Sequence, residues 1–258
     1  MIRPQMFSGG ALPLADPGEV IFQSAGASNS QTVFNWVVPA GVYEVCMLGV
    51  SSHKAYATRV SRGGNDLLNT TWASGTNNAH GGDGGDARNV NTVYNGGGGA
   101  GGYSGPGGLG MYQRDEGMGN YSLIKGTDGQ GGGGGGGGGG QTYQGRGGGV
   151  GIYGIGANGA AGLISTQGSP GGTGSDKGLY RAGAGTLHNE WSAAGFPYAK
   201  PGGNLRYRNA LAVIPGETLT ITLDFWIRDN AAGTGAIVRI LWGGERSFPS
   251  NAPVNTPT

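Results

Sequence analysis

The side chains that could carry chemistry are few and lie far apart in the sequence. The histidines, His53, His80 and His188, are not neighbours, and none stands at zinc-ligand spacing from the single cysteine, Cys46. Cys46 lies in an apolar run typical of a buried strand, where a thiol acts as a small core residue. No serine has the G-x-S-x-G surroundings of a hydrolase nucleophile. We therefore expect no catalytic residue, no metal site and no enzymatic activity.

Two glycine motifs resemble ligand-binding sequences, but both lack the required context. Residues 105–110 match G-x-G-x-x-G, yet they follow no clear strand and begin no helix, as a dinucleotide site would require. Residues 81–86 (GGDGGD) resemble half of a calcium-binding nonapeptide repeat. That repeat occurs in tandem, whereas here there is one copy, and Arg88 replaces an apolar residue. We expect no bound cofactor, and a solvated turn at residues 81–86.

Charge is sparse, and this excludes several classes of partner. The 258 residues include 16 Lys and Arg and 15 Asp and Glu, a net charge of +1. The basic residues form no run, and nucleic-acid binding needs a basic cluster, so we expect no nucleic-acid partner. The sequence contains no stretch of about 18 apolar residues, so we expect no membrane insertion. Because the N-terminus lacks the apolar region of a signal peptide, we expect synthesis in a cytoplasm.

Glycine divides the chain into three regions. Residues 81–174 contain 41 of the 61 glycines, between an N-terminal block (1–80) and a C-terminal block (175–258). The chain also has 5 Trp, 11 Tyr and 6 Phe, which is a composition typical of folded rather than disordered chains. We therefore expect the glycines to belong to an ordered structure, with the three regions forming one composite domain.

Both flanking blocks are predicted to be β-structure. Residues 32–38 and 42–50 are rich in β-branched and aromatic residues, and the Pro39-Ala40-Gly41 turn between them makes the pair a candidate hairpin. In residues 219–227 apolar and polar side chains alternate, so one face is expected to be buried. Residues 211–214 are a short strand and residues 236–242 a closing strand, followed by an extended proline-containing tail (247–258).

The glycine-rich middle has no helical periodicity. Its extreme is a run of ten, formed by Gly131, Gly132, Gly133, Gly134, Gly135, Gly136, Gly137, Gly138, Gly139 and Gly140. Glycine segments can lie side by side as polyproline-II helices, whose backbone groups must bond to neighbouring segments. The alternative is a flexible linker. We expect an all-β and irregular fold: a β-sandwich-like base with an inserted polyproline-II-type glycine helix bundle, in which the ten-glycine run is structural.

Scattered aromatic residues in and after the glycine-rich region are candidates for a recognition surface. Aromatic side chains provide rigid contact area at low entropic cost. The alternative is that they cover the glycine bundle or pack at a subunit interface. The candidate receptor-binding residues are Tyr103, Tyr112, Tyr121, Tyr143, Tyr153, His188 and Trp191.

Several segments resemble the glycine-rich domains of tailed-phage virion proteins. Residues 36–42 (WVVPAGV) resemble their opening, and residues 96–105 (GGGGAGGYSG) and 147–151 (GGGVG) resemble their internal motifs. The turn and strand at residues 214–219 (IPGETL) also resemble the family. The most specific piece is the ending, AIVRILWG followed by RSFP, at residues 236–249. The sequence departs from the family at residues 50–78, which are mixed and polar.

The resemblance implies an exterior virion protein of the fibre or spike type, made in the host cytoplasm. Its architecture would be similar to the polyglycine-helix adhesin tips of T-even-like long tail fibres. The expected role is attachment to a host surface glycan or protein, as a homo-oligomer, namely a trimer, bound to other virion proteins. The alternative is a non-adhesive component, such as a capsid decoration protein or fibre connector. A weaker alternative is an ice-binding protein, although large residues interrupt any regular row of small ones.

Overall fold

The structure, a computed structural model, describes residues 14–24, 30–87, 95–117, 120–139, 145–164, 169–175, 181–183, 201–225, 235–243 and 246–249. Within these ranges the regular elements are β-strands, apart from one 3-10 turn at Thr76–Asn78. The strands pair antiparallel, which confirms the predicted all-β class. In the described part of the chain, no helix is long and apolar enough to cross a bilayer.

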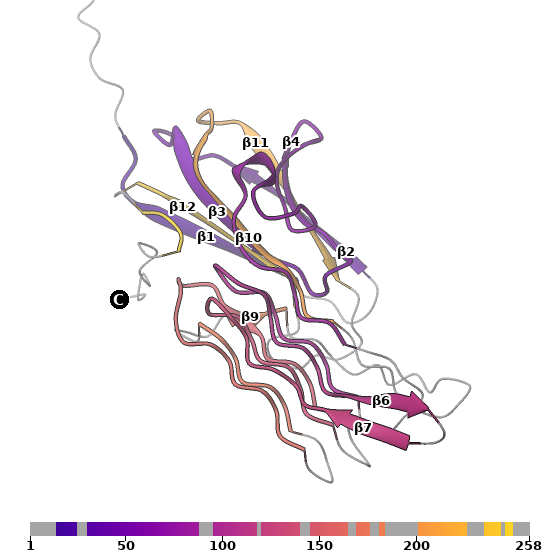
Figure 1. Cartoon of the computed structure of the whole chain (residues 1–258). Coiled ribbons are helices and arrows are strands. Elements are labelled where there is room, and N and C mark those ends of the chain that lie inside the picture. The colour runs from indigo at the N-terminus through magenta and orange to yellow at the C-terminus, as the bar shows by residue number, and fades with distance from the viewer. Residues whose placement is uncertain are drawn as a thin grey trace, which may run out of the picture.

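Two four-stranded sheets form a sandwich (Figure 1). Sheet A has the order β1-β12-β3-β10 and sheet B the order β2-β11-β4-β5. The strands of sheet A are β1 (Gly18–Gln23), β12 (Ile237–Trp242), β3 (Glu44–Val50) and β10 (Leu205–Ala212). Those of sheet B are β2 (Ser30–Val37), β11 (Thr218–Phe225), β4 (Thr58–Arg62) and β5 (Asn65–Asn69).

An apolar core fills the space between the two sheets. In β11 the predicted alternation is confirmed, because Leu219, Ile221 and Leu223 are fully buried and the threonines between them lie on the opposite face. The facing strands of sheet A contribute alternate residues to the same core, among them Val45, Met47, Val238 and Ile240. The sequence therefore forms this sandwich by the ordinary period-two rule of half-buried strands.

The predicted hairpin at residues 32–50 is wrong. β2 pairs with β11 in sheet B, whereas β3 pairs with β12 and β10 in sheet A. The turn at Pro39-Ala40-Gly41 therefore carries the chain from one sheet to the other. Val38 and Val42, on either side of this turn, are both buried between the sheets. Burial of these two valines favours an arch across the sandwich over a tight hairpin within one sheet.

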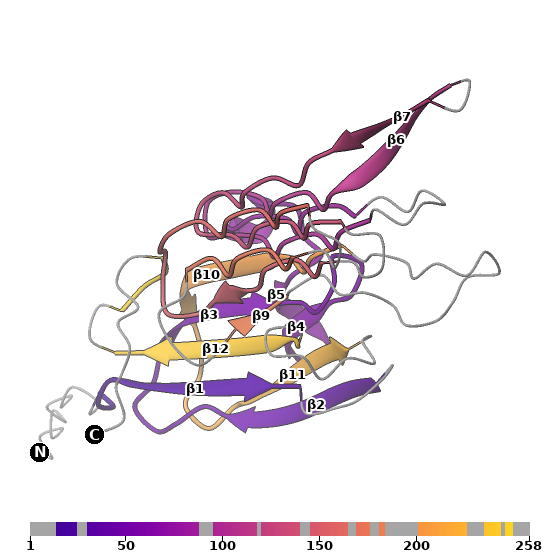
Figure 2. The same cartoon turned by 90° about the horizontal axis from the view of Figure 1, so that it is seen from below.

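The glycine-rich region forms a third layer on the outer face of sheet A (Figure 2). We call residues 81–87, 95–111, 125–139, 145–164 and 169–175 the glycine-rich layer. Its apolar side chains, including Ala100, Tyr103 and Ile152, pack on Leu48 and Ile237 of sheet A in a second core. Two short ladders accompany the layer, β6 (Tyr112–Gly117) with β7 (Asn120–Ile124) and β8 (Val150–Gly151) with β9 (Arg181–Ala182). Sheet A is thus covered on both faces.

Backbone hydrogen bonds with a three-residue repeat hold the layer together. Along the buried run of residues 134–138, two amides three positions apart donate to the same neighbouring segment. The bonds are Gly134 to Ala100, Gly135 to Gly172, Gly136 to Thr127, Gly137 to Gly97 and Gly138 to Ser169, at 2.7 to 3.0 Å. Each of three successive amides therefore points to a different neighbour.

The carbonyl groups of this run show the same repeat toward three further segments. The accepted bonds come from Gly108 to Gly134, Met111 to Gly137, Gly148 to Gly135, Gly145 to Gly138, Gly159 to Gly133 and Gly162 to Gly136, at 2.7 to 2.9 Å. The central run thus bonds to neighbours on all sides, through both of its backbone groups. The amides and carbonyls named here are therefore paired with backbone groups of neighbouring segments.

The layer needs glycine because neighbouring backbones touch where a Cβ would stand. A Cβ on Gly136 would lie 1.7 Å from the carbonyl oxygen of Leu109, and a Cβ on Gly99 would lie 2.0 Å from that of Gly134. These partners are backbone atoms held by hydrogen bonds and cannot rotate away. Even alanine is therefore excluded at these positions.

A buried arginine ties the layer to sheet A. Arg239, at the centre of β12, is fully buried and donates to the carboxylate of Glu19 on β1. It also donates to the carbonyl of Ile152 in the layer, at 3.0 Å, and its guanidinium lies 4.3 Å from the ring centroid of Tyr153. Glu19 accepts a further bond from Arg246 at 3.1 Å. One charged group thus connects two strands of sheet A with the layer above them.

A second buried arginine connects the start of the layer with β10. Arg206 donates to the carbonyl of Trp72 at 2.7 Å and forms an ion pair with Asp83. The neighbouring Asn204 accepts a hydrogen bond from the amide of Gly84 at 2.9 Å. The chain segment that enters the layer is therefore fixed by Arg206 of β10 and by Asn204, the residue that precedes this strand.

We predict that Gly136→Ala lowers the free energy of unfolding by about 3 kcal/mol, because overpacking against fixed backbone has no cheap relaxation. Gly126→Ala is the matched control, since its Cβ would come no closer than 3.1 Å to the Leu109 oxygen. Chemical denaturation followed by tryptophan fluorescence measures both variants. Equal stabilities for the two variants would contradict the close backbone packing described above.

We predict that Arg239→Met also lowers the free energy of unfolding by about 3 kcal/mol, because it leaves the Glu19 carboxylate without its main partner. The control is Arg114→Met on β6, whose side chain is 61% exposed and forms only a surface ion pair. Thermal unfolding monitored by circular dichroism compares the two. The double variant Arg239→Met/Glu19→Gln is expected to recover part of the loss.

Candidate functional site

The glycine-rich layer has two unlike ends. At one end the chain turns tightly, as at residues 103–104 and 131–132, next to sheet A. The other end, which we call the loop-bearing end, is made of Asp86, Met111, Gly138, Leu163 and Ser169. Hydrogen bonds connect these places, from Gly110 to Asp86, from Met111 to Gly137, from Gly138 to Ser169 and from Ser169 to Leu163.

The β6–β7 hairpin starts from the loop-bearing end and projects beyond the layer (Figures 1 and 2). Its surface is amphipathic and carries both charge signs. The Arg114 guanidinium lies 3.6 Å from the carboxylate of Glu116, which accepts a 2.6 Å hydrogen bond from Ser122. Leu123 on the same hairpin is exposed. Such a surface can make apolar, charged and hydrogen-bonding contacts with a partner.

The structure places the predicted receptor-binding residues in different environments. Tyr112 stands half-buried at the base of the hairpin, and Tyr121 occupies the position in β7 opposite Asp115. Tyr143, His188 and Trp191 lie outside the described residues. Sequence reasoning missed Arg114, Glu116 and Leu123, because short runs of mixed polar residues carry no motif. The hairpin pairing places Ser122 beside Arg114 and Glu116 on one face and Leu123, opposite Gln113, on the other.

Tyr103 and Tyr153 are not part of an exposed surface, which corrects the prediction for these two residues. Tyr103 is 1% exposed, and its hydroxyl donates to the carbonyl of Gly151 at 3.1 Å and accepts from the amide of Gly154 at 3.0 Å. Burial raises the pKa of this hydroxyl well above its ordinary value. Tyr153 lies beneath Arg239. Both rings pack the layer onto sheet A, as the alternative interpretation of the aromatic residues predicts.

Of the ten-glycine run, the structure describes Gly131 to Gly139, and Gly140 lies outside the described residues. Residues 132–139 are buried at the centre of the layer. Their backbone groups bond to the neighbouring segments of the layer.

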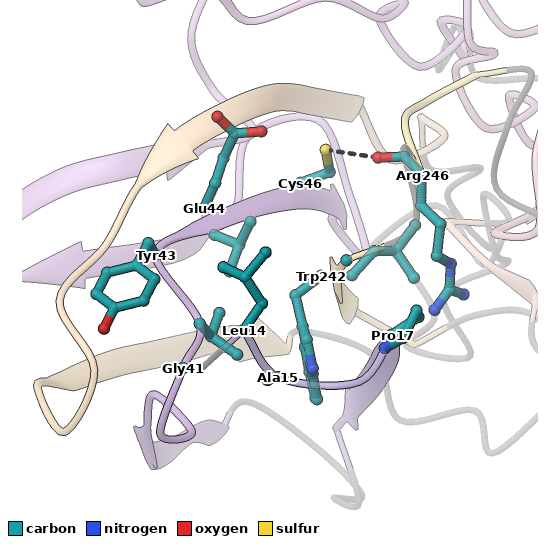
Figure 3. A pocket seen from close by; sticks show the side chains of 13 residues that line it. Leu14, Ala15, Pro17, Gly41, Tyr43, Glu44, Cys46, Trp242 and Arg246 are labelled. Carbon is teal, nitrogen blue, oxygen red and sulfur yellow. Dashed lines mark hydrogen bonds between the residues drawn. The ribbon is translucent and has the colours of Figure 1, made fainter. Parts of the chain in front are cut away.

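A pocket of about 270 Å³ lies beside the start of β1 and the end of β12 (Figure 3). Leu14, Tyr43 and Trp242 form much of its wall, and Cys46 lies at its inner side. The thiol donates a 3.1 Å hydrogen bond to the carbonyl of Arg246, as Figure 3 shows. Burial raises the pKa of the Cys46 thiol. A protonated, hydrogen-bonded thiol is a poor nucleophile.

A second pocket, of about 520 Å³, lies where β10 meets the turn end of the layer. His80 and Tyr207 line it with their ring centroids 5.6 Å apart, and Asp83 lies beside them. The Asp83 carboxylate already pairs with Arg206. Among the described residues, no group of three or more His, Cys, Asp or Glu side chains could hold a metal ion.

No family model, curated protein or solved structure matches this chain.

We predict that Cys46 resists alkylation in the folded protein. The raised pKa lowers the thiolate fraction at any pH below it, and the side chain is only 6% exposed. With iodoacetamide at pH 8, followed by mass spectrometry, labelling of the native chain is expected to be at least roughly a hundredfold slower than labelling in denaturant. Equal rates in the two conditions would contradict a buried, protonated thiol.

Proposed function

We propose that this chain is an exterior structural protein of a tailed-phage particle and that it attaches the particle to the host surface. The loop-bearing end of the glycine-rich layer makes the contact, whereas the sandwich joins other virion proteins. The observation that carries the proposal is the one-sided arrangement of the layer. The β6–β7 hairpin starts from one end of the layer and projects beyond it.

We also propose that the segments of the layer are polyproline-II-type glycine helices. The three-residue repeat of their hydrogen bonds supports this, because such a helix has three residues per turn and no internal hydrogen bonds. Donation by successive amides to different neighbours is the pattern expected of packed helices of this kind. A bundle so bonded is stiff, since each backbone group is fixed by a neighbouring segment.

A stiff layer suits attachment for a physical reason. Contacts presented on a rigid scaffold lose little conformational entropy on binding. Several copies on one particle then give high avidity from individually weak contacts. The exposed Leu123 on one face of the hairpin offers an apolar contact to a glycan or protein surface, and the pair Arg114 and Glu116 on the other face offers charged contacts. No bond is made or broken in this role, so no catalytic group is needed.

The alternative within the same class is a non-adhesive particle component, a capsid decoration protein or fibre connector. It would use the same stiff layer but would not need the hairpin side chains. The two proposals therefore predict different effects of removing those side chains.

We predict that the purified chain adsorbs to cells of the phage host and reduces subsequent adsorption of particles. The double variant Arg114→Ala/Leu123→Ala is expected to lose at least roughly tenfold in cell binding, because both side chains project from the hairpin. The matched control, Arg59→Ala/Ile214→Ala, removes an exposed arginine and an exposed aliphatic side chain from the sandwich. It is expected to bind like the original chain.

Fluorescently labelled protein and flow cytometry measure cell binding, and circular dichroism checks that both variants fold. Failure of the original chain to bind cells would exclude the adhesin role and favour the non-adhesive component. Immunogold electron microscopy tests the wider proposal. Absence of the chain from intact particles would overturn both virion roles.

A further inference from the structure

Strand β2 is a free edge of sheet B. It pairs with β11 along its whole length, from Ser30 opposite Phe225 to Val37 opposite Thr218. Within the described residues, no strand pairs with its other side. Figure 2 shows β2 at the border of the sandwich. An edge of this kind offers a row of unpaired amides and carbonyls to another strand.

The backbone alternation fixes which residues of β2 offer these groups. The amide of Val38 donates to the carbonyl of Glu217 and therefore points toward the β11 side. In an antiparallel ladder the direction alternates from residue to residue. The backbone groups of Phe34 and Trp36 accordingly face β11. The groups that face outward belong to Gln31, Val33, Asn35 and Val37.

Nothing in the sequence of β2 blocks this edge. Its eight residues, SQTVFNWV, contain no charged residue and no proline, the usual means by which proteins protect an edge strand. Val33 and Val37 are 50% and 57% exposed on the outer face. The edge strand β10, by contrast, is partly covered by a bridge between His80 and Tyr207, and the edge strand β1 carries Glu19.

Half-buried aromatic rings lie along the same open side, between the two sheets. Phe34 packs against Phe22 of β1 with ring centroids 5.2 Å apart, and Trp36 packs against Trp242 of β12 at 5.8 Å. All four rings are partly exposed. Aromatic residues are enriched at protein interfaces. The four aromatic rings and the free edge of β2 together therefore form a candidate contact surface.

We infer that β2 pairs antiparallel with β2 of a second copy of this chain. A strand without charge meets its own copy without like-charge repulsion, and a two-fold axis makes one edge complementary to itself. With the axis at Phe34, Gln31 of one copy lies opposite Val37 of the other, and Val33 lies opposite Asn35. This register uses all four outward residues and gives about eight new backbone hydrogen bonds. The two Phe34 rings meet at the axis.

The pairing joins two copies of sheet B into one continuous sheet and leaves both glycine-rich layers free. It does not depend on the proposed attachment role. It predicts a dimer, whereas the resemblance to virion proteins implies a trimer.

We predict that the chain is a dimer at tens of micromolar and that Val33→Lys raises its dissociation constant at least roughly a hundredfold, because charge on an edge opposes strand pairing. The control is Thr222→Lys, which puts the same charge on the same face one strand inward, opposite Val33. It is expected to remain a dimer. Sedimentation equilibrium gives the masses, and circular dichroism shows that both variants fold.

A second variant, Asn35→Pro, removes an outward amide without touching the β11 ladder and is also expected to be a monomer. Amide exchange adds an independent measure: the amides of Val33 and Asn35 should exchange slowly in the dimer and rapidly in the Val33→Lys monomer. A monomeric or trimeric original chain would overturn the inference. So would a dimer that Val33→Lys leaves unchanged.

Discussion

Direct hydrogen bonding between touching backbones holds the glycine-rich layer together, and the rest of the structure depends on that constraint. A buried amide or carbonyl without a partner is costly, and a segment of glycines has no side chain with which to supply one. The run at residues 133–138 resolves this by bonding to neighbours on all sides with a three-residue repeat. The same closeness excludes a Cβ, because it would overlap a carbonyl such as that of Leu109. Close packing and backbone hydrogen bonding therefore both require residues without a Cβ, and only glycine meets this requirement.

Because the layer consists largely of glycine, only a few side chains are available to attach it to the sandwich. The few apolar residues it carries, Ala100, Tyr103 and Ile152 among them, are concentrated against sheet A. Burial of sheet A on both faces explains why β3 and β12 are apolar almost throughout. Arg239 then bonds to a carbonyl of the layer, so that a charge buried in sheet A is neutralised by Glu19 and orients the layer at the same time.

The buried and the exposed side chains lie in different parts of the molecule. The sandwich and the second core contain most of the buried side chains, whereas Asp86 and Leu163 at the loop-bearing end and Arg114 and Leu123 on the β6–β7 hairpin are exposed. Changes at the hairpin have few packed neighbours to disturb, so its side chains can vary with little cost in stability. The free edge of β2 lies in the sandwich, so contact between copies and contact with a surface would use separate parts of the molecule.

The sequence by itself determined the strands with a clear period and the place of the glycines. Leu219, Ile221 and Leu223 predict a half-buried strand because side-chain alternation is a local property, and the glycine density of residues 81–174 predicts close backbone packing. Only the tertiary structure decided that residues 32–50 form an arch, that Tyr103 and Tyr153 are buried, and that Arg114 and Leu123 share a projecting hairpin. The physical reason is that pairing partners and burial depend on contacts between distant segments. Neither periodicity nor composition records which distant segments meet.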